Sequence, residues 1–349
     1  MESAGISRST VGLVAISFVV GSIITGSGVY FLLQQGISQP ISSAPKPALD
    51  RFKVSGFSPT VDSIILLTNT GRDRGIWSSW GLDPEFIFNP DRPIVAADLK
   101  QQVESGIKFG ISGSAEVLLA RSNGLPLKIV GSLEGQSILK IYVKSGGSIK
   151  TVKDLDGKRI GVTATNNPTG RAATYISNRF AIKPEIIPFG NLTNLVVGLK
   201  LGRIDAFINS GGSALRLVDS GELGLLSRMK DVYPQPYVGL VFFATEDVIE
   251  HDPDLVRRFI KATSETTKYL GENPEYAADI IAKTTGAPGD LAHRVAAEID
   301  WSPLKRVPGE DLLAGVTNNW VVAREAGAVS ASAWEKVKVE DVVDVRFLP

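Results

Sequence analysis

The sequence predicts an α/β fold made of two lobes, and two observations lead to this prediction. Short apolar runs alternate along the chain with amphipathic segments of about ten residues, which is typical of strands that alternate with helices. Two further apolar runs, residues 137–143 and 237–244, flank a stretch that repeats this alternation by itself. We therefore expect the chain to leave a first lobe through one run and to return through the other.

The first lobe is predicted from apolar runs that end in small polar residues. Residues 63–67 form such a run and end in Thr68, Asn69 and Thr70, which predicts a strand buried on both faces of a parallel sheet. Further strands are expected at 85–88, 109–112 and 127–131, and helices at 74–80, 95–104 and 115–122. Beyond the return, Asp252-Pro253 and Asn273-Pro274 indicate helix starts, and residues 310–326 and 331–337 are expected to be helices that pack on the first lobe.

The second lobe is predicted from two strands, each of which is followed by a short polar stretch and the start of a helix. A strand at 159–162 precedes the polar stretch 163–171 and a helix at 172–179. A helix at 194–201 and a strand at 204–208 follow, and residues 209–213 open another helix. Each junction brings hydroxyls, amides and unpaired backbone N–H groups to one point, which favours a ligand cradle. An ordinary strand-to-helix loop with capping residues has the same pattern and stays open as the alternative at either junction.

The composition excludes several classes of function. A chain of 349 residues is long enough for two domains, and 37 basic against 37 acidic side chains give no net charge to attract nucleic acid. Because the chain contains no cysteine, it has no disulfide framework, thiolate metal site, cysteine nucleophile or lipid-modified amino-terminal cysteine.

The amino-terminal residues follow a different pattern from the rest. Residues 11–33 carry no charge and as a helix would be about 35 Å long, enough to cross the hydrocarbon core of a bilayer. We expect residues 1–35 to be an uncleaved membrane anchor, because the run is longer than a secretory signal core and no Ala-x-Ala-like cleavage site follows closely. A cleaved signal segment is the alternative. Residues 36–57, rich in Gln, Ser, Pro and Gly, are expected to be a flexible linker.

No catalytic motif is found in the chain. Signatures of zinc proteases, serine hydrolases, dinucleotide-binding folds and phosphate loops are absent. Ser137 and Lys140 have the spacing of serine acyl-enzymes, but on a strand their side chains would point to opposite faces. His251 and His293 are expected on the surface without a metal partner nearby in sequence. We therefore expect no enzyme activity, no cofactor and no metal site.

Five stretches together carry a resemblance to a known family. They are Arg74-Gly-Ile-Trp77 with Trp80-Gly-Leu-Asp-Pro84, Phe109-Gly-Ile-Ser-Gly-Ser-Ala-Glu116, Gly124-Leu-Pro-Leu-Lys-Ile-Val130, Lys153-Asp-Leu-Asp-Gly-Lys-Arg-Ile-Gly-Val162 and Lys200-Leu-Gly-Arg-Ile-Asp-Ala206. They resemble the substrate-binding proteins of ABC transporters, in the branch that serves nitrate, sulfonate, taurine and thiamine-pyrimidine importers. Where this family often has an acidic residue after the third strand, the chain has Gly113-Ser114.

The resemblance implies a type II periplasmic-binding fold with two crossover strands. Lobe I is then expected at 58–143 and 240–349, and lobe II at 144–239. The implied protein is a monomer outside the cytoplasm, held by its amino-terminal helix or secreted if that segment is cleaved. It would present a small anionic or zwitterionic organic solute, such as a sulfonate, taurine, or a nitrate-like or pyrimidine-like molecule, to an ABC permease. An enzyme of the same fold acting on a small aromatic precursor and a ligand-sensing domain are the alternatives, although the related thiamine-pyrimidine synthases use a cysteine-rich iron site that this chain lacks.

The candidate ligand-binding residues lie where strands are expected to end, because open α/β sheets hold ligands at the carboxyl ends of their strands. Helix starts after Ser112 and Thr169 favour an anion, and Arg171 could add a charge-assisted contact or lie exposed on its helix. Trp77, Trp80 and Tyr237 are candidates for the cleft wall, with packing favoured for the tryptophans. The complete set is Thr68, Asn69, Thr70, Ser112, Gly113, Ser114, Gln136, Thr163, Asn166, Asn167, Thr169, Gly170, Arg171, Asn209, Ser210, Gly211 and Tyr237.

Overall fold

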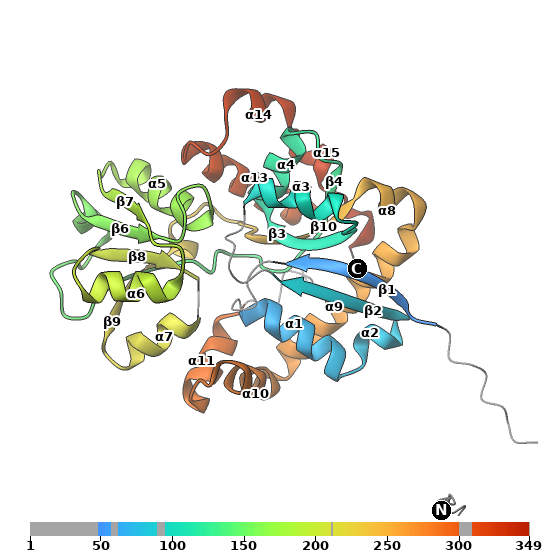
Figure 1. The fold of residues 1–349 in the computed structure, drawn as a ribbon, viewed down its shortest axis with the longest axis horizontal. Helices are drawn as coiled ribbons and strands as arrows, with labels where there is room; N and C mark the ends of the chain where they lie inside the picture. Colours follow the sequence, from blue (N-terminus) through green and yellow to red (C-terminus); the bar gives the residue numbers. More distant parts are fainter. Residues whose placement is uncertain (1–47, 57–61, 89–94, 211, 300–308, 349) are drawn as a thin grey trace, which may run out of the picture. The chain divides into compact units, whose positions relative to one another are not determined.

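Two five-stranded mixed sheets organise the chain in the computed structural model, which describes residues 48–56, 62–88, 95–210, 212–299 and 309–348. The first sheet has the strand order β2-β1-β3-β10-β4 and the second the order β7-β6-β8-β5-β9 (Figure 1). The strands of the first sheet are β1 (Asp50–Gly56), β2 (Leu82–Phe88), β3 (Phe109–Gly113), β4 (Leu127–Ser132) and β10 (Leu240–Thr245). Those of the second are β5 (Lys140–Lys144), β6 (Arg159–Val162), β7 (Glu185–Pro188), β8 (Ala206–Asn209) and β9 (Leu223–Arg228).

The two sheets share one pairing pattern. In the first, β1 pairs parallel with β2 and β3, and β10 runs antiparallel to β3 and β4. In the second, β6 pairs parallel with β7 and β8, and β5 runs antiparallel to β8 and β9. Each sheet is therefore parallel except for one strand, and that strand adjoins a segment that crosses between the sheets.

Helices cover both sheets. The helices that precede β5 or follow β10 are α1 (Asp62–Asp73), α2 (Ile76–Ser79), α3 (Ala96–Glu104), α4 (Ser114–Ser122), α8 (Glu246–His251), α9 (Pro253–Glu272), α10 (Pro274–Thr285), α11 (Gly289–Glu298), α13 (Gly309–Glu325), α14 (Ala331–Lys336) and α15 (Val339–Val342). Between β5 and β10 lie α5 (Pro168–Phe180), α6 (Leu192–Lys200) and α7 (Gly212–Asp219). Short 3₁₀ turns are η1 (Val152–Leu155), η2 (Met229–Asp231) and η3 (Val345–Phe347).

Each sheet has an apolar core on both faces. Phe109, Phe242 and Phe259 lie in the core between the first sheet and helices α1, α2 and α9, while Phe243 and Trp320 lie on the other face, with α4 and α13. The second sheet packs one face against α6 and α7 and the other against α5. A sheet covered on both faces accounts for the short, continuous apolar strands of the sequence.

The structure corrects the prediction of a strand at 63–67, because these residues lie in helix α1. Ile64 and Leu67 pack into the core against the first sheet, whereas Ile65 and Leu66 belong to a second apolar cluster that includes Leu270 and several residues of α10. A helix that is buried on two sides is apolar all round, and over a few residues it cannot be distinguished from a buried strand.

The first strand of the chain is instead β1, at residues for which we expected a flexible linker. Phe52 and Val54 are buried, whereas Arg51 and Lys53 are exposed, so the strand alternates at its start. β1 pairs with both β2 and β3 and is therefore an interior strand of the first sheet. We placed it in the linker because residues 36–57 as a whole are rich in Gln, Ser, Pro and Gly.

The structure also shifts the boundary between the lobes. Residues 140–143, which we placed in lobe I, belong to β5 of the second sheet. The first connection between the sheets therefore spans residues 133–139, and the return spans 229–239. Most other expected elements are confirmed within a few residues, including β3, β4, β6 and α13. Among the described residues no helix is both long and apolar enough to cross a bilayer, and the apolar run 11–33 lies outside them.

Candidate functional site

The two connections join the sheets at one end of their strands, and we call these strand ends the joined edges of the two sheets. In the first sheet, Leu240 at the start of β10 lies in register with Gly113 at the end of β3. In the second, Lys140 at the start of β5 lies opposite Asn209 at the end of β8 and Arg228 at the end of β9. The loops that follow β3, β6 and β8 therefore lie at the joined edges. These are the carboxyl edges, at which α/β sheets bind ligands.

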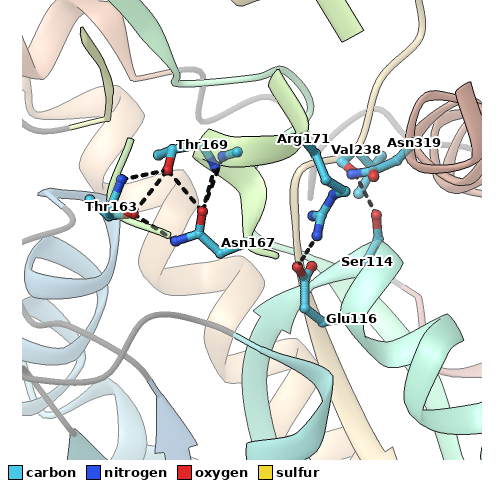
Figure 2. Close-up of polar contacts among 9 residues, drawn as sticks. Ser114, Glu116, Thr163, Asn167, Thr169, Arg171, Val238 and Asn319 are labelled. Carbon is cyan, nitrogen blue, oxygen red and sulfur yellow. Dashed lines mark hydrogen bonds and ion pairs between the residues drawn. The ribbon is translucent and has the colours of Figure 1, made fainter. Parts of the chain in front are cut away.

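The loop between β6 and α5 is held by a closed network of three side chains (Figure 2). Asn167 caps the helix, since its Oδ1 accepts from the backbone N–H groups of Thr169 (3.0 Å) and Gly170 (3.2 Å). Asn167 Nδ2 donates to Thr163 Oγ1 (2.6 Å), and Thr169 Oγ1 accepts from Thr163 N (3.0 Å). These three predicted site residues are brought together, but they bind mainly to one another. They fix the loop, and the exposed Asn166 projects from it.

Gly170 allows this loop to fold back over the start of α5. A Cβ added at Gly170 would lie 2.2 Å from the Thr165 carbonyl oxygen and 2.5 Å from that of Ala164. Because both contacts are to backbone, a larger residue would force the loop away from the helix. Gly170 therefore shapes the cradle and offers no side chain to a ligand.

A buried ion pair joins the helices that follow β3 and β6. Arg171 on α5 places Nη1 2.5 Å from Oε1 of Glu116 on α4, and the two side chains are 7% and 1% exposed (Figure 2). Burial acts to lower the pKa of Arg171, but the charge of Glu116 and its hydrogen bond outweigh burial and raise the pKa above the usual value. We expected Arg171 either to reach a ligand or to lie exposed, and the structure places it in a contact between the first turns of the two helices.

Three tyrosines surround the Arg171 side of this pair. The Tyr233 and Tyr237 rings stack with their centroids 4.6 Å apart, and Tyr175 meets Tyr233 edge-on at 5.1 Å. Burial raises the pKa of both the Tyr233 and the Tyr237 phenol, and the positive charge of Arg171 opposes the shift. Tyr237, a predicted ligand residue, is therefore a buried, neutral part of the wall behind Arg171.

The start of α4 is anchored to the returning connection. The Ser114 hydroxyl donates to the Val238 carbonyl (2.8 Å), and Asn319 of α13 donates to the same oxygen (2.8 Å) (Figure 2). Ser112 is 1% exposed, and its hydroxyl has no hydrogen-bond partner among the described residues. At Gly113 an added Cβ would lie 2.0 Å from Glu116 Oε2, so glycine leaves room for that carboxylate.

Gln136 lines a cavity of about 530 Å³ beside the second sheet. The remaining lining residues are Arg228, Lys230, Asp231, Ala297, Glu298 and Ile299. Glu298 of α11 lies 2.9 Å from Lys140 Nζ and 3.0 Å from Arg228 Nη2. Burial acts to raise the pKa of Glu298, but these two cations outweigh it and lower the pKa below its usual value. The wall of this cavity is polar and carries both signs of charge.

The other predicted residues fall into three groups. Thr68, Asn69 and Thr70 lie in the second half of α1 rather than at the end of a strand, so their predicted position is wrong; the Thr68 hydroxyl, for example, donates to the Ile65 carbonyl of its own helix. Asn209 ends β8, and the half-buried Ser210 follows it, as expected. Gly211 lies outside the described residues.

Sequence reasoning missed four charged residues of this region: Glu116, Lys140, Arg228 and Glu298. Glu116 stands in the quoted Phe109–Glu116 stretch, but its partner is 55 positions away. Lys140 and Arg228 come together only through the pairing of β5 with β9, a strand that the sequence pattern did not predict. One signal was available for Glu116, since an acidic residue in the first turn of a helix faces the helix amino terminus.

Comparison with known proteins places this chain in a family. The model of the family described as NMT1/THI5 like matches residues 65–277, which is more than half of the chain. The chain belongs to the NMT1/THI5-like family. The resemblance inferred from the sequence motifs is thereby confirmed.

Two curated proteins are similar to this NMT1/THI5-like chain at low identity. The riboflavin-binding protein RibY of Chloroflexus aurantiacus is 23% identical over 273 residues, covering 74% of this chain and 76% of its own. The 4-amino-5-hydroxymethyl-2-methylpyrimidine phosphate synthase THI5 of Saccharomyces cerevisiae is 23% identical over 222 residues, covering 58% of this chain. The match spans 62% of the synthase, which is less than two thirds of its length.

A solved structure shows the same fold. The alkanesulfonate-binding protein SsuA from Xanthomonas axonopodis pv. citri, bound to MOPS, superposes with a TM-score of 0.69 at 16% identity. The superposition covers 86% of this chain and all of SsuA. The NMT1/THI5-like chain therefore has the fold of periplasmic binding proteins, as expected.

Proposed function

We propose that this protein is the extracytoplasmic solute-binding component of an ABC importer, which captures a small anionic or zwitterionic organic solute between its two lobes. The observation that carries the proposal is the meeting of α4 and α5. Each helix follows the carboxyl end of a strand in its own sheet, and their first turns are in contact through Glu116 and Arg171. Helix starts and paired charges at facing strand ends supply both dipole and charge to a solute.

The similar proteins support the class of function. RibY and SsuA are binding proteins by name, and both resemble this chain over most of its length. Periplasmic binding proteins work outside the cytoplasm, and the apolar run 11–33 offers an anchor or an export signal for such a location. A permease is the partner that this class of function requires.

An enzyme of the same fold is the second candidate, favoured by the similarity to the yeast synthase. The chain contains no cysteine, so a cysteine-rich iron site of the kind found in the related synthases is impossible here. Capture without chemistry is therefore the preferred function.

A ligand screen on the full chain in mild detergent tests the proposal. Small organic anions and zwitterions, flavins and aminopyrimidines are added, and thermal unfolding is measured. A true ligand at 100-fold its dissociation constant stabilises the folded protein by roughly 2.7 kcal/mol. Mass spectrometry of the recovered compound separates capture from catalysis: an unchanged molecule supports a binding protein, and a converted one supports the enzyme. A complete screen without any stabilising compound would contradict both.

Alanine variants locate the site. Asn166 lies exposed on the loop after β6, and Asn209 is the last residue of β8. We expect Asn166→Ala and Asn209→Ala to abolish the ligand-induced stabilisation, and we expect Asn166→Ala to leave the unfolding temperature of the free protein unchanged because its side chain is exposed. Asn123→Ala, at the exposed carboxyl end of α4 and so away from the strand ends that face the site, serves as the control and keeps the full ligand effect. Unchanged affinity in both site variants would place the pocket elsewhere.

A further inference from the structure

One oxygen of the Glu116 carboxylate has no hydrogen-bond partner in the part of the chain that the structure describes. Glu116 is 1% exposed, and its Oε1 is bound by Arg171, whereas Oε2 is buried without a partner among the described residues. Leaving a charged oxygen buried and unpartnered costs free energy, so such an atom in a folded protein requires an explanation. A missing donor is the simplest explanation for an acceptor-only group.

The neighbouring groups of the chain do not supply that donor. The Ser114 hydroxyl is engaged by the Val238 carbonyl, and the Ser114 backbone N–H by the Gly239 carbonyl. Gly113, against which Oε2 lies, has no side chain. The Ser112 hydroxyl is itself buried without a partner nearby. The start of α4 therefore holds two unpartnered polar atoms, a carboxylate oxygen and a hydroxyl.

Arg171 has hydrogen-bond donors that the ion pair does not use. Its guanidinium has five N–H donors in a planar fork, and the hydrogen bond described at this group uses Nη1 alone. A guanidinium recognises carboxylate, sulfonate and similar oxyanions through two parallel hydrogen bonds. The ion pair thus has an unused acceptor on one member and unused donors on the other.

We propose that Glu116 determines specificity by accepting a hydrogen bond from an N–H group of the ligand. The solute is a zwitterion whose ammonium binds Glu116 Oε2 while its oxyanion binds Arg171. This inference rests on the proposed function and narrows its ligand class. The hydrogen bond between Glu116 and Arg171 can remain, because the ligand binds the atoms that this bond leaves unused. Both charges remain compensated in the closed cleft.

A simple oxyanion cannot satisfy the same site. It could occupy the unused donors of Arg171, but it would leave Glu116 Oε2 without a donor and would place a second negative charge beside a buried carboxylate, which is unfavourable. We therefore expect the site to reject nitrate and plain alkanesulfonates relative to their aminated counterparts.

Matched pairs of compounds test this inference on the full chain. The pairs are 2-aminoethanesulfonate with ethanesulfonate, 3-aminopropanesulfonate with propanesulfonate, and 4-aminobutanoate with butanoate, each measured by calorimetric titration up to millimolar concentration. In at least one pair the aminated member should bind about 30-fold more tightly or better. In Glu116→Gln this preference should fall to near unity, because the amide no longer attracts an ammonium. Glu246→Gln, which alters a carboxylate paired with Arg121 on the outside of the first lobe, should keep the full preference.

The outcomes separate this inference from the function on which it rests. Plain anions that bind as tightly as their aminated partners in the wild-type protein would overturn the inference and leave solute capture standing, and this comparison requires no variant to fold. A preference that persists in Glu116→Gln would also overturn it. Failure of all three aminated compounds to bind overturns the inference, whereas failure of the wider screen is what overturns the proposed function.

Discussion

Gly170 shows how a single residue without a side chain shapes the candidate site. The carbonyls of Ala164 and Thr165 approach the Gly170 Cα so closely that a methyl group there would collide with backbone. Residues 163–167 can therefore fold back over the start of α5, where Asn167 caps the helix and binds Thr163.

The first prediction concerns this close approach. Gly170→Ala should destabilise the protein by about 1–3 kcal/mol, because the loop or the helix must move to admit the methyl group. Urea denaturation measures the change. Gly289→Ala is the matched control, since Gly289 begins α11 with nothing within 4 Å of its position for a Cβ, and it should be neutral or slightly stabilising. Equal stability of the two variants would contradict the prediction.

The buried ion pair between Arg171 and Glu116 gives a second prediction at the residue scale. Removing the charge of one member leaves the other buried without compensation, which typically costs about 3–5 kcal/mol. Glu116→Gln and Arg171→Gln should each destabilise the protein, and the double variant should lose much less than the sum of the two. Additive losses in a urea-denaturation cycle would show that the two groups do not interact in solution.

At the scale of elements, helix α1 and strand β1 both differ from the sequence prediction, which placed a strand at 63–67 and a flexible linker at 36–57. α1 lies between the core of the first sheet and the cluster that contains α10, so both of its sides are apolar. β1 has polar residues at its start, but it pairs on both edges and carries Val54 into the core. Position within the fold, not local propensity, decided both elements.

The third prediction follows from the interior position of β1. A chain that starts at residue 58 lacks this strand and should fail to fold, because β2 and β3 would lose the strand that pairs with both. A chain that starts at residue 48 retains β1 and should unfold cooperatively on heating. Circular dichroism during thermal unfolding distinguishes the two. Similar cooperative transitions would show that β1 is dispensable.

At the scale of the whole molecule, two sets of ion pairs join residues 140–228 to helices that lie before β5 or after β10. Glu298 on α11 pairs with Lys140 and Arg228 of the second sheet, as Glu116 on α4 pairs with Arg171 on α5. In each of these ion pairs the cation lies within the segment from β5 to β9 in the sequence, and the carboxylate lies before β5 or after β9. The second sheet and its helix α5 therefore supply the cation of each pair.

The fourth prediction is a dependence of stability on pH. The folded pKa of Glu298 lies below its unfolded value of about 4.3, so its contribution is present above that value and is lost as the pH falls through the folded pKa. We expect acid to reduce the unfolding free energy of the wild-type protein more steeply than that of Glu298→Gln. Urea titrations at a series of pH values from neutral to acid provide the measurement. Parallel pH profiles would contradict it.

The sequence by itself determined the α/β class, the family, and the strand-to-helix junctions at Ser112–Ser114, Thr163–Arg171 and Asn209. These features are encoded within a few consecutive residues, since a strand, its polar end and the following helix start are neighbours along the chain. For example, the sequence places Asn167 and Thr169 at the start of a helix, and in the structure Asn167 caps that helix through the Thr169 backbone N–H.

Only the tertiary structure decided which charges meet. Glu116 and Arg171 are 55 positions apart, and Glu298 reaches Lys140 and Arg228 through sheet pairing and helix packing that no local pattern specifies. Partnership between distant side chains depends on how whole elements pack, and burial then decides whether a carboxylate such as Glu116 is solvated or depends on one partner. The sequence therefore locates the strand-to-helix junctions, and the packing of whole elements decides which charges meet beside them.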